Sequence, residues 1–383
     1  MLFKRLLSSA RTLGDKYIYF GNPSLNRHSF LRSDQQFITN AIKSKDAKYL
    51  LFNNLLPIAD KEANKFFVTG YDKLGPQLTK EIDQWLNFNN DPLSTNGARP
   101  SLLVHFLGLS EKNGKLETAR ESGFQYKAYH GTPYFAIDIV KSSQVLKELE
   151  SNHPNVEPLV TREEVNKHLN NFEASIFAQG KMYLDWLSTT QFCRGCGSSV
   201  VPINAGSELK CTSTKEKHCP VKEAPVSNAS FPRLDPVLIT CVVNQDKQVL
   251  LTRLPKFPQG LYSCIAGFIE PGETVENAVK REVWEEAGLH VQRVEIIQSQ
   301  PWPFPANIMI GSVAYVDTSE LDLLHDMELQ DARWVDKEII TDIVYKGTEN
   351  NDLTLIGPGL DFGIANDKTL ATNLYKYAVD NIL

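Results

Sequence analysis

The stretch that decides the fold reads Gly267-Phe-Ile-Glu-Pro-Gly-Glu273-Thr-Val-Glu-Asn-Ala-Val-Lys-Arg281-Glu282-Val-Trp-Glu285-Glu286-Ala-Gly288-Leu289. Pro271-Gly272 predicts a turn, Thr274 is a suitable N-cap, and Gly288 ends the helix that Thr274 begins. On the helical wheel, the apolar positions 275, 278 and 279 share a face with Glu282 and Glu286, and Glu285 borders it. A solvated acidic helix would place its glutamates opposite the apolar stripe. Carboxylates on a buried face need a counter-charge, so we expect Arg281 and a Mg²⁺ or Mn²⁺ ion to supply it.

These residues resemble the Nudix box at every fixed position: Gly, five residues, Glu, seven residues, then Arg-Glu-Val-x-Glu-Glu-x-Gly-Leu. The resemblance implies an α/β/α sandwich that hydrolyses a nucleoside diphosphate linked to another group. It implies that Glu282, Glu285 and Glu286 are metal ligands and catalytic residues, with Glu286 or Glu285 as the base. It also implies cation ligands at Glu328 and at the carbonyl of Ala266, and structural support from Gly267, Glu273, Arg281 and Gly288.

A second segment reads Ser299-Gln-Pro-Trp-Pro-Phe-Pro305-Ala-Asn307-Ile-Met309. Its alternating prolines favour an extended or polyproline II backbone that displays Trp302 and Phe304. The two rings are suited to stacking on a base or on a nicotinamide ring. They are equally suited to packing within a rigid loop, and the spacing alone does not distinguish these two roles. The segment resembles the NADH pyrophosphatase signature, with Asn307 where that family usually has Ser. This implies substrate contacts from Phe231, Phe268, Gln300, Pro301, Trp302, Pro303, Phe304, Pro305, Ala306 and Asn307.

Four of the six cysteines lie close together, at Cys193, Cys196, Cys211 and Cys219. A Cys-x₂-Cys pair followed by a second pair is typical of a zinc site, and four thiolates leave no open position for catalysis. We therefore predict one structural Zn²⁺ per chain, the alternative being four free thiols in a loop. Cys241 and Cys264 lie in apolar runs and are predicted to be small buried residues.

The predicted fold class is α/β, with a Nudix sandwich after a small four-cysteine zinc-ribbon segment and an N-terminal mixed α/β domain. We divide the chain into a targeting segment at 1–16, an N-terminal domain resembling NADH pyrophosphatases at 17–170, a helix and zinc segment at 171–230, and the Nudix domain at 231–383. Strands are predicted at 101–108, 134–140, 237–243 and 249–253, and a helix at 172–187.

Composition narrows the function classes. The 383 residues are 42% hydrophobic and 22% charged, with a net charge of −6, which is typical of a globular protein and disfavours a disordered or fibrous one. The chain lacks the overall excess of basic residues that is typical of proteins that bind nucleic acid. The composition leaves room for a local basic groove. No apolar run approaches the roughly 18 to 20 residues of a spanning helix, so we expect a soluble protein without a membrane partner. The N-terminus lacks the cleavage pattern and the continuous apolar core of a secretory signal, and we expect an intracellular protein.

The two ends point to different organelles. The N-terminus has Lys, Arg, Ser and Leu but no acid before Asp15, as in a mitochondrial presequence. Eukaryotic relatives are often peroxisomal, but the chain ends Asn381-Ile-Leu383, which lacks the small-basic-Leu pattern. Composition and resemblance therefore leave peroxisome and mitochondrion unresolved.

The combined resemblance is to the fungal members of the NADH pyrophosphatase (NAD-capped RNA hydrolase) family. It implies an enzyme that converts NADH or NAD⁺ and water to (reduced) nicotinamide mononucleotide and AMP, and that removes NAD caps from RNA. It also implies a homodimer. Two alternatives stay open: a Nudix hydrolase of another nucleoside diphosphate such as ADP-ribose, and a non-catalytic nucleotide sensor or zinc-ribbon binding module. The complete set of box carboxylates disfavours the second.

Overall fold

The computed structural model describes residues 18–21, 25–73, 75–94, 97–111, 123–214, 217–223, 229–350 and 354–383. The predicted targeting segment at 1–16 lies outside them. The chain forms two compact units: one contains residues 234–383 together with residues 18–21, and the other lies within residues 22–233. The predicted N-terminal domain and cysteine segment thus share one unit, and the boundary with the C-terminal unit falls after Arg233. No helix in the described ranges is both long and apolar enough to cross a bilayer.

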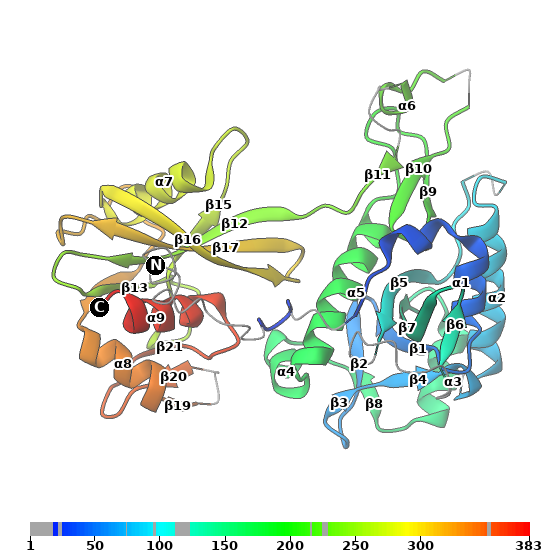
Figure 1. The fold of residues 1–383 in the computed structure, drawn as a ribbon, viewed down its shortest axis with the longest axis horizontal. Helices are drawn as coiled ribbons and strands as arrows, with labels where there is room; N and C mark the ends of the chain where they lie inside the picture. Colours follow the sequence, from blue (N-terminus) through cyan, green and yellow to red (C-terminus); the bar gives the residue numbers. More distant parts are fainter. Residues whose placement is uncertain are drawn as a thin grey trace, which may run out of the picture. The chain divides into compact units, whose positions relative to one another are not determined.

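The C-terminal unit is built on a six-stranded mixed sheet (Figure 1). The strand order is β16-β17-β12-β13-β18, with β15 beside β12; β12 runs parallel to β17, and the other neighbours are antiparallel. The predicted strands at 237–243 and 249–253 are confirmed as β12 and β13. The bounds are β12 (Asp235–Val243), β13 (Val249–Arg253), β15 (Ile265–Phe268), β16 (Val291–Trp302), β17 (Asn307–Val316) and β18 (Asp331–Val335).

Helices cover both faces of this sheet. Alternate residues of β12 point to opposite sides, so Leu238 and Val242 join the core beneath α7, whereas Ile239 and Cys241 join the core beneath α8 and α9. The expected α/β/α arrangement of this unit therefore follows from a central strand that is apolar on both faces (Figure 1). The remaining elements are α7 (Val275–Ala287), α8 (Lys337–Lys346), α9 (Leu370–Asn381), β14 (Leu261–Tyr262), β19 (Thr348–Glu349), β20 (Thr354–Ile356) and β21 (Gly363–Ala365).

The proline-rich segment is a hairpin turn rather than a continuous ribbon. Strand β16 ends at Trp302, β17 begins at Asn307, and these two residues pair across the hairpin. The predicted extended backbone is correct up to Trp302 and wrong for residues 303–306, because two antiparallel strands require the chain to reverse there.

The unit formed by residues 22–233 has its own sheet and core. Helices α1, α2 and α3 contribute to the core cluster on one face, and α5 contacts β5 and β7. The predicted helix at 172–187 is confirmed as α5, which begins with a capping box between Asn170 and Glu173. The bounds are α1 (Gln35–Ile42), β1 (Lys48–Asn53), β2 (Leu56–Asp60), β3 (Lys65–Phe66), β4 (Val68–Gly70), α2 (Pro76–Asn90), β5 (Leu103–Ser110), β6 (Phe124–Tyr126), β7 (Tyr129–Asp138), α3 (Ser143–Asn152), β8 (Val156–Pro158), α4 (Arg162–His168) and α5 (Asn171–Thr189), with 3-10 turns η1 (Ser29–Ser33) and η2 (Tyr71–Lys73).

The cysteine segment is tied to this core by a hairpin. Ala205, in the turn between β9 and β10, is fully buried among N-terminal core residues. Its N–H donates to Asn89 Oδ1 at 3.3 Å, and its carbonyl accepts from the Phe106 N–H at 3.3 Å. This inserted turn explains why the segment does not form a separate unit. Its elements are β9 (Val200–Ile203), β10 (Glu208–Cys211), α6 (Pro220–Glu223) and β11 (Ala229–Ser230).

Candidate active site

The loop and helix of the 267–289 stretch have the predicted bounds. Thr274 Oγ1 accepts from the Asn277 N–H at 3.3 Å and starts α7, and Gly288 ends the helix with a φ of 70°. Before the helix, Glu273 Oε2 accepts from the Glu270 N–H at 2.9 Å. The Glu273 side chain therefore closes the loop just before α7 begins.

Gly267 provides the space in which the Glu282 carboxyl lies. A Cβ built on Gly267 would lie 2.1 Å from Cδ of Glu282, which is far inside contact distance. The preceding residue, Ala266, is exposed on β15 and pairs with Ile239 of β12. The absence of a side chain at 267 thus allows the first box glutamate of α7 to reach the backbone of β15.

Arg281 connects the loop, the strand and the helix. Its Nε and Nη2 donate to Glu273 Oε1 and Oε2 at 2.8 and 3.0 Å, a bidentate pair. Its Nη1 donates to Glu282 at 2.8 Å and to Glu285 at 2.9 Å. Nη2 also donates to the carbonyl of Phe268 at 2.9 Å. The guanidinium lowers the pKa of Glu273 to about 2, so this carboxyl stays ionised.

Glu286 is the buried member of the acidic group. It is 4% exposed, and burial raises its pKa to about 8, helped by the negative charges of Glu282, Asp326, Glu328 and Glu285. Burial also raises the pKa of Glu282, although Arg281 opposes the shift. The structure thus brings all four predicted acidic ligands close enough to interact electrostatically. The donor set, oxygen atoms with more negative charge than Arg281 neutralises, fits a hard divalent cation.

Asp326 is an acidic neighbour that the sequence reading missed. Its Oδ1 accepts from the Glu328 N–H at 3.0 Å, and Met327 between them has a φ of 57°. The Asp322 N–H, earlier in the same loop, donates to the carbonyl of Ala287 at 3.0 Å, next to the end of α7. The sequence shows Asp326 as an acid two residues before Glu328. This spacing alone does not tell whether the residue forms a turn or binds a metal.

The segment from Gln300 to Asn307 contains buried and open residues. Gln300 is fully buried, and its amide binds the carbonyls of Tyr19 and Lys368 and the N–H of Leu370, so in this structure it joins three chain segments. Trp302 and Phe304 are half-buried and each contacts the ring of Phe20 edge-on, with centroids 5.9 Å apart. Pro303 and Ala306 are buried, Pro301 is half-buried, and Pro305 is exposed.

Three further candidates differ in how exposed their side chains are. The Asn307 Oδ1 is buried and has no hydrogen-bond partner among the residues that the structure describes. Phe268, next to Gly267, is 61% exposed. Phe231 is 58% exposed and belongs to the unit of residues 22–233.

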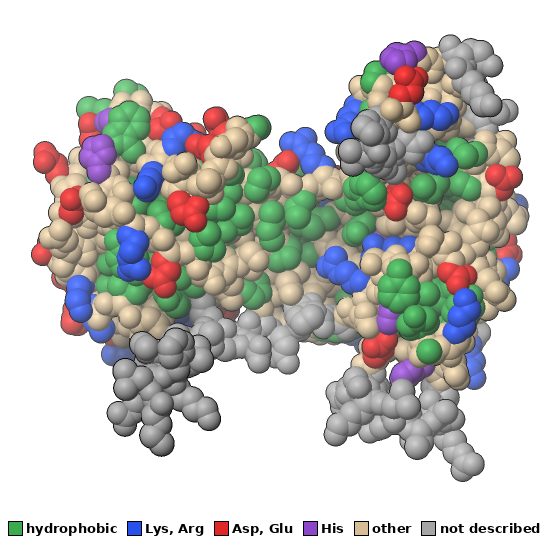
Figure 2. Space-filling view, turned by 45° about the horizontal axis from the view of Figure 1, so that its top comes forward, with side chains coloured by type: hydrophobic (Ala, Val, Ile, Leu, Met, Phe, Trp, Pro, Cys, Tyr) green, Lys and Arg blue, Asp and Glu red, His purple; other side chains and the backbone are tan. Residues whose placement is uncertain are grey.

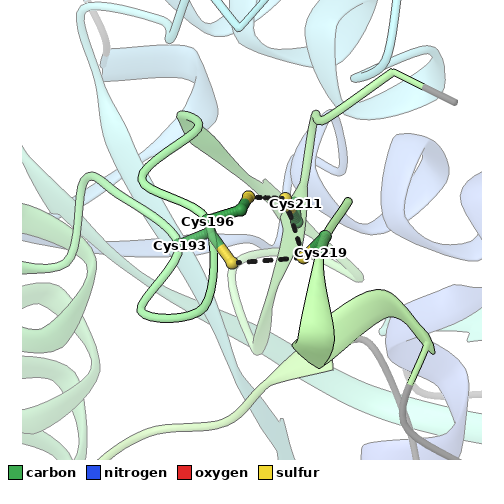
Figure 3. A group of neighbouring side chains, drawn as sticks. All are labelled: Cys193, Cys196, Cys211 and Cys219. Atoms are coloured by element: carbon green, nitrogen blue, oxygen red, sulfur yellow. Dashed lines mark hydrogen bonds between the residues drawn. The ribbon is translucent and has the colours of Figure 1, made fainter. Parts of the chain in front are cut away.

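The four cysteines form one cluster, in which the sulfur atoms point toward one another (Figure 3). The Sγ separations are 3.8 Å for Cys193–Cys219, 3.6 Å for Cys196–Cys211 and 3.9 Å for Cys219–Cys211. A regular tetrahedron with metal–sulfur distances of about 2.3 Å has edges of about 3.8 Å, so this arrangement fits one metal ion with four thiolate ligands. Burial raises the pKa of Cys193 to about 11, whereas the Ser198 hydroxyl and N–H lower that of Cys196 to about 6.

Comparison with known proteins agrees with this geometry. A family model described as NUDIX domain matches residues 233–352. The NAD-capped RNA hydrolase NPY1 of Saccharomyces cerevisiae is 34% identical over 383 residues, which cover 95% of this chain and 95% of that protein. The NAD-capped RNA hydrolase of Schizosaccharomyces pombe is 30% identical, over 84% of this chain and 83% of its own length. The NAD-capped RNA hydrolase NUDT12 of Homo sapiens is 30% identical, over 86% of this chain and 69% of its own length. Because the similarity extends over nearly the whole sequence, this chain belongs to the NAD-capped RNA hydrolase family of Nudix proteins.

Proposed function

We propose that this chain hydrolyses the diphosphate of NADH and NAD⁺, both free and as the cap of an RNA. The products are (reduced) nicotinamide mononucleotide and AMP, or an RNA with a 5′-monophosphate. The observation that supports this most strongly is the buried Glu286, surrounded by Glu282, Glu285 and Glu328 with Arg281 beside them. The names of relatives that match nearly the whole chain support the substrate class.

Glu282, Glu285, Glu286 and Glu328, with the carbonyl of Ala266, are the residues that would hold Mg²⁺ or Mn²⁺. The cation supplies Lewis-acid stabilisation to the charged oxygens of the diphosphate. Glu286 or Glu285 accepts the proton of the attacking water. Arg281 does not act on the substrate in this scheme; it holds Glu282 and Glu285 in position through Nη1.

Substrate recognition is assigned to the aromatic and polar groups around the β16–β17 turn. Phe268, Trp302 and Phe304 offer rings, and Asn307 is proposed as a polar contact of the substrate. Phe231 is proposed as a further stacking residue. The buried Gln300 would act through the position of the hairpin rather than by direct contact.

The four-cysteine cluster is proposed to hold one structural Zn²⁺, and the active form is proposed to be a homodimer. Within each unit, Lys/Arg and Asp/Glu side chains are interspersed on the side shown in Figure 2. The net charge of −6 favours recognition of the NAD cap over tight binding of the RNA body. The peroxisome and the mitochondrion stay alternative proposals for location.

The test is a product analysis with the wild type and Glu286→Gln, given NADH, NAD⁺, NAD-capped RNA and ADP-ribose with Mg²⁺. We expect AMP and the mononucleotide from NADH and NAD⁺, 5′-monophosphate RNA from the capped RNA, and turnover lowered by orders of magnitude in the variant. Glu276→Gln is the matched control, because Glu276 is an exposed glutamate in the first turn of the same helix. Wild-type turnover in a folded Glu286→Gln would refute the assigned role. Activity on ADP-ribose alone would favour a different substrate, and inactivity on all four would favour a sensor.

A further inference from the structure

The N-terminal residues 18–21 pack against the hairpin that β16 and β17 form. Phe20 contacts both Trp302 and Phe304, with ring centroids 5.9 Å apart in each pair and interplanar angles of 87° and 73°. Trp302 and Phe304 also contact each other, with centroids 5.7 Å apart and an angle of 70°. The three rings therefore form one cluster of edge-to-face pairs, a geometry that aromatic side chains favour.

The two neighbours of Phe20 are held against the last residues of β16. The carbonyl of Tyr19 accepts from the amide of Gln300 at 3.0 Å. Gly21 approaches Pro301 so closely that a Cβ added to the glycine would lie 3.0 Å from Cδ of Pro301. Phe20 is thus fixed from both sides along the chain as well as through its ring.

Phe20 has a backbone conformation that a bulky residue rarely adopts. Its φ is 68°, in the left-handed region. A conformation of this kind costs free energy and persists where the surrounding contacts determine it. The Gly21 N–H donates to the carbonyl of Ile18 at 2.8 Å and closes a turn around Phe20. The turn and the ring contacts together keep the Phe20 side chain in the aromatic cluster.

The three rings differ in how far a ligand can reach them. Phe20 is 3% exposed, whereas Trp302 and Phe304 are half-buried. A ligand that stacks on the cluster therefore touches Trp302 or Phe304 and not Phe20. Ordering a mobile side chain costs conformational entropy, so a ring that is already fixed binds its ligand more tightly. In this cluster, the buried ring supports the two rings that a ligand can contact.

We propose that Phe20 is a positioning residue for substrate recognition, which fixes the orientation of Trp302 and Phe304 so that a base or the nicotinamide ring stacks on them. This inference rests on the proposed function, which assigns those two rings to the substrate. Because Phe20 is buried and acts through its neighbours, its loss should weaken substrate binding more than it slows the bound complex. The expected kinetic signature is a raised KM with kcat little changed.

The first test compares KM, kcat and melting temperature in Phe20→Ala and Ile340→Ala. Ile340 is fully buried on α8 in the core of the same unit, so its truncation controls for lost packing. We expect Phe20→Ala to raise the KM for NADH about tenfold, as for the loss of two aromatic pairs, with kcat within about twofold of the wild type. Ile340→Ala should lower the melting temperature and leave KM unchanged.

Phe20→Leu keeps the measurement valid if the alanine variant unfolds. Leucine refills most of the lost volume without supplying a ring, so we expect a melting temperature near that of the wild type and a KM raised about threefold. A KM equal to that of the wild type in a folded Phe20→Ala, or in Phe20→Leu, would overturn the proposal.

A double-variant cycle tests whether Phe20 acts through Trp302. Trp302→Ala should itself raise KM, and adding Phe20→Ala to it should raise KM by a smaller factor than in the wild-type background. The reason is that one of the two rings that Phe20 supports is already missing. Losses that simply multiply would show that the two residues act independently and would contradict the positioning role.

Binding without turnover separates this proposal from the proposed function. NADH fluorescence gives the dissociation constant in a Glu286→Gln background, to which Phe20→Ala is then added. About tenfold weaker binding would support the positioning role even if the wild type failed to hydrolyse NADH, a result that would refute the proposed reaction alone. Hydrolysis by the wild type with an equal dissociation constant in both backgrounds would overturn the positioning role alone. Absence of NADH binding to Glu286→Gln would also overturn it.

Discussion

Arg281 binds both carboxylate oxygens of Glu273 and, through its Nη1, also binds Glu282 and Glu285. One guanidinium therefore fixes the loop before α7 and orients two of the box glutamates on the helix itself. This arrangement uses the forked geometry of arginine, and a lysine ammonium cannot reproduce it.

The first prediction concerns the guanidinium of Arg281. We expect Arg281→Lys to lower kcat by about tenfold to a hundredfold, the effect of losing charge-assisted hydrogen bonds worth about 1.5–3 kcal/mol. Glu273→Gln should have a smaller effect, because Gln keeps one acceptor for the guanidinium. The double variant should lose less than the product of the two single effects, since both act on one network. Steady-state kinetics of the three variants measure this, and strictly multiplicative losses would contradict it.

The second prediction concerns Gly267. Gly267→Ala should displace the Glu282 carboxyl, because the added Cβ would lie 2.1 Å from its Cδ. We expect a higher Mg²⁺ concentration for half-maximal activity and a kcat lowered by about tenfold or more, with little change in melting temperature. Gly272→Ala is an informative control: Gly272 has a φ of 95° but nothing near its Cβ position, so its effect should be on stability. An unchanged Mg²⁺ requirement in Gly267→Ala would be inconsistent with this account.

A structural feature could be predicted from the sequence when the residues that cause it are neighbours in the chain. The bounds of α7 were predictable because Thr274 and Gly288 act on the helix that they flank. The two-sided burial of β12 was visible as a continuous apolar run. The role of Gln300 was not predictable, because its amide binds backbone groups 281 and 68 positions away. The turn at 303–306 was missed because the proline pattern is local, whereas strand pairing fixed the reversal.

The third prediction concerns Asp326, which sequence reasoning missed. Because its Oδ1 accepts from the Glu328 N–H, Asp326→Ala should release Glu328 and lower Mg²⁺-dependent turnover by about five- to tenfold. Asp326→Asn keeps an acceptor oxygen without the charge and should stay within about twofold of the wild type. Met327→Gly, which accepts the positive φ at that position, should leave activity unchanged. If Asp326→Asn were as impaired as Asp326→Ala, the charge rather than the turn would be the important property.

The fourth prediction concerns the cysteine cluster. Cys196→Ser should lower the zinc content below one ion per chain and lower the melting temperature, because metal binding at a four-thiolate site contributes directly to folding. Cys264→Ala is the control, since Cys264 is buried in the core of the other unit and is not one of the four clustered cysteines. Elemental analysis and thermal melts of both variants measure the effect. A Cys196→Ser protein with full zinc content would exclude Cys196 as a ligand.

The fifth prediction follows from the buried Glu286, whose pKa is raised to about 8, mainly by burial. An unfolded glutamate titrates near pH 4.3, so between about pH 4.3 and 8 the unfolded chain releases a proton that the folded chain retains. Without added Mg²⁺, this residue should therefore make the folded state less stable as the pH rises through that range. Glu286→Gln should remove that part of the pH dependence and melt at a higher temperature than the wild type near pH 8.

Added Mg²⁺ should reverse this effect in the wild type, because a cation stabilises the ionised carboxylate and displaces its proton. We expect the rise in melting temperature on adding Mg²⁺ to be larger near pH 8 than near pH 6, and to be small in Glu286→Gln at both. Scanning calorimetry of the two proteins at both pH values, with and without Mg²⁺, measures the four differences. Glu276→Gln, changed at an exposed position of the same helix, should behave as the wild type. A Mg²⁺-induced rise that is equal at the two pH values would show that Glu286 does not exchange its proton for the cation.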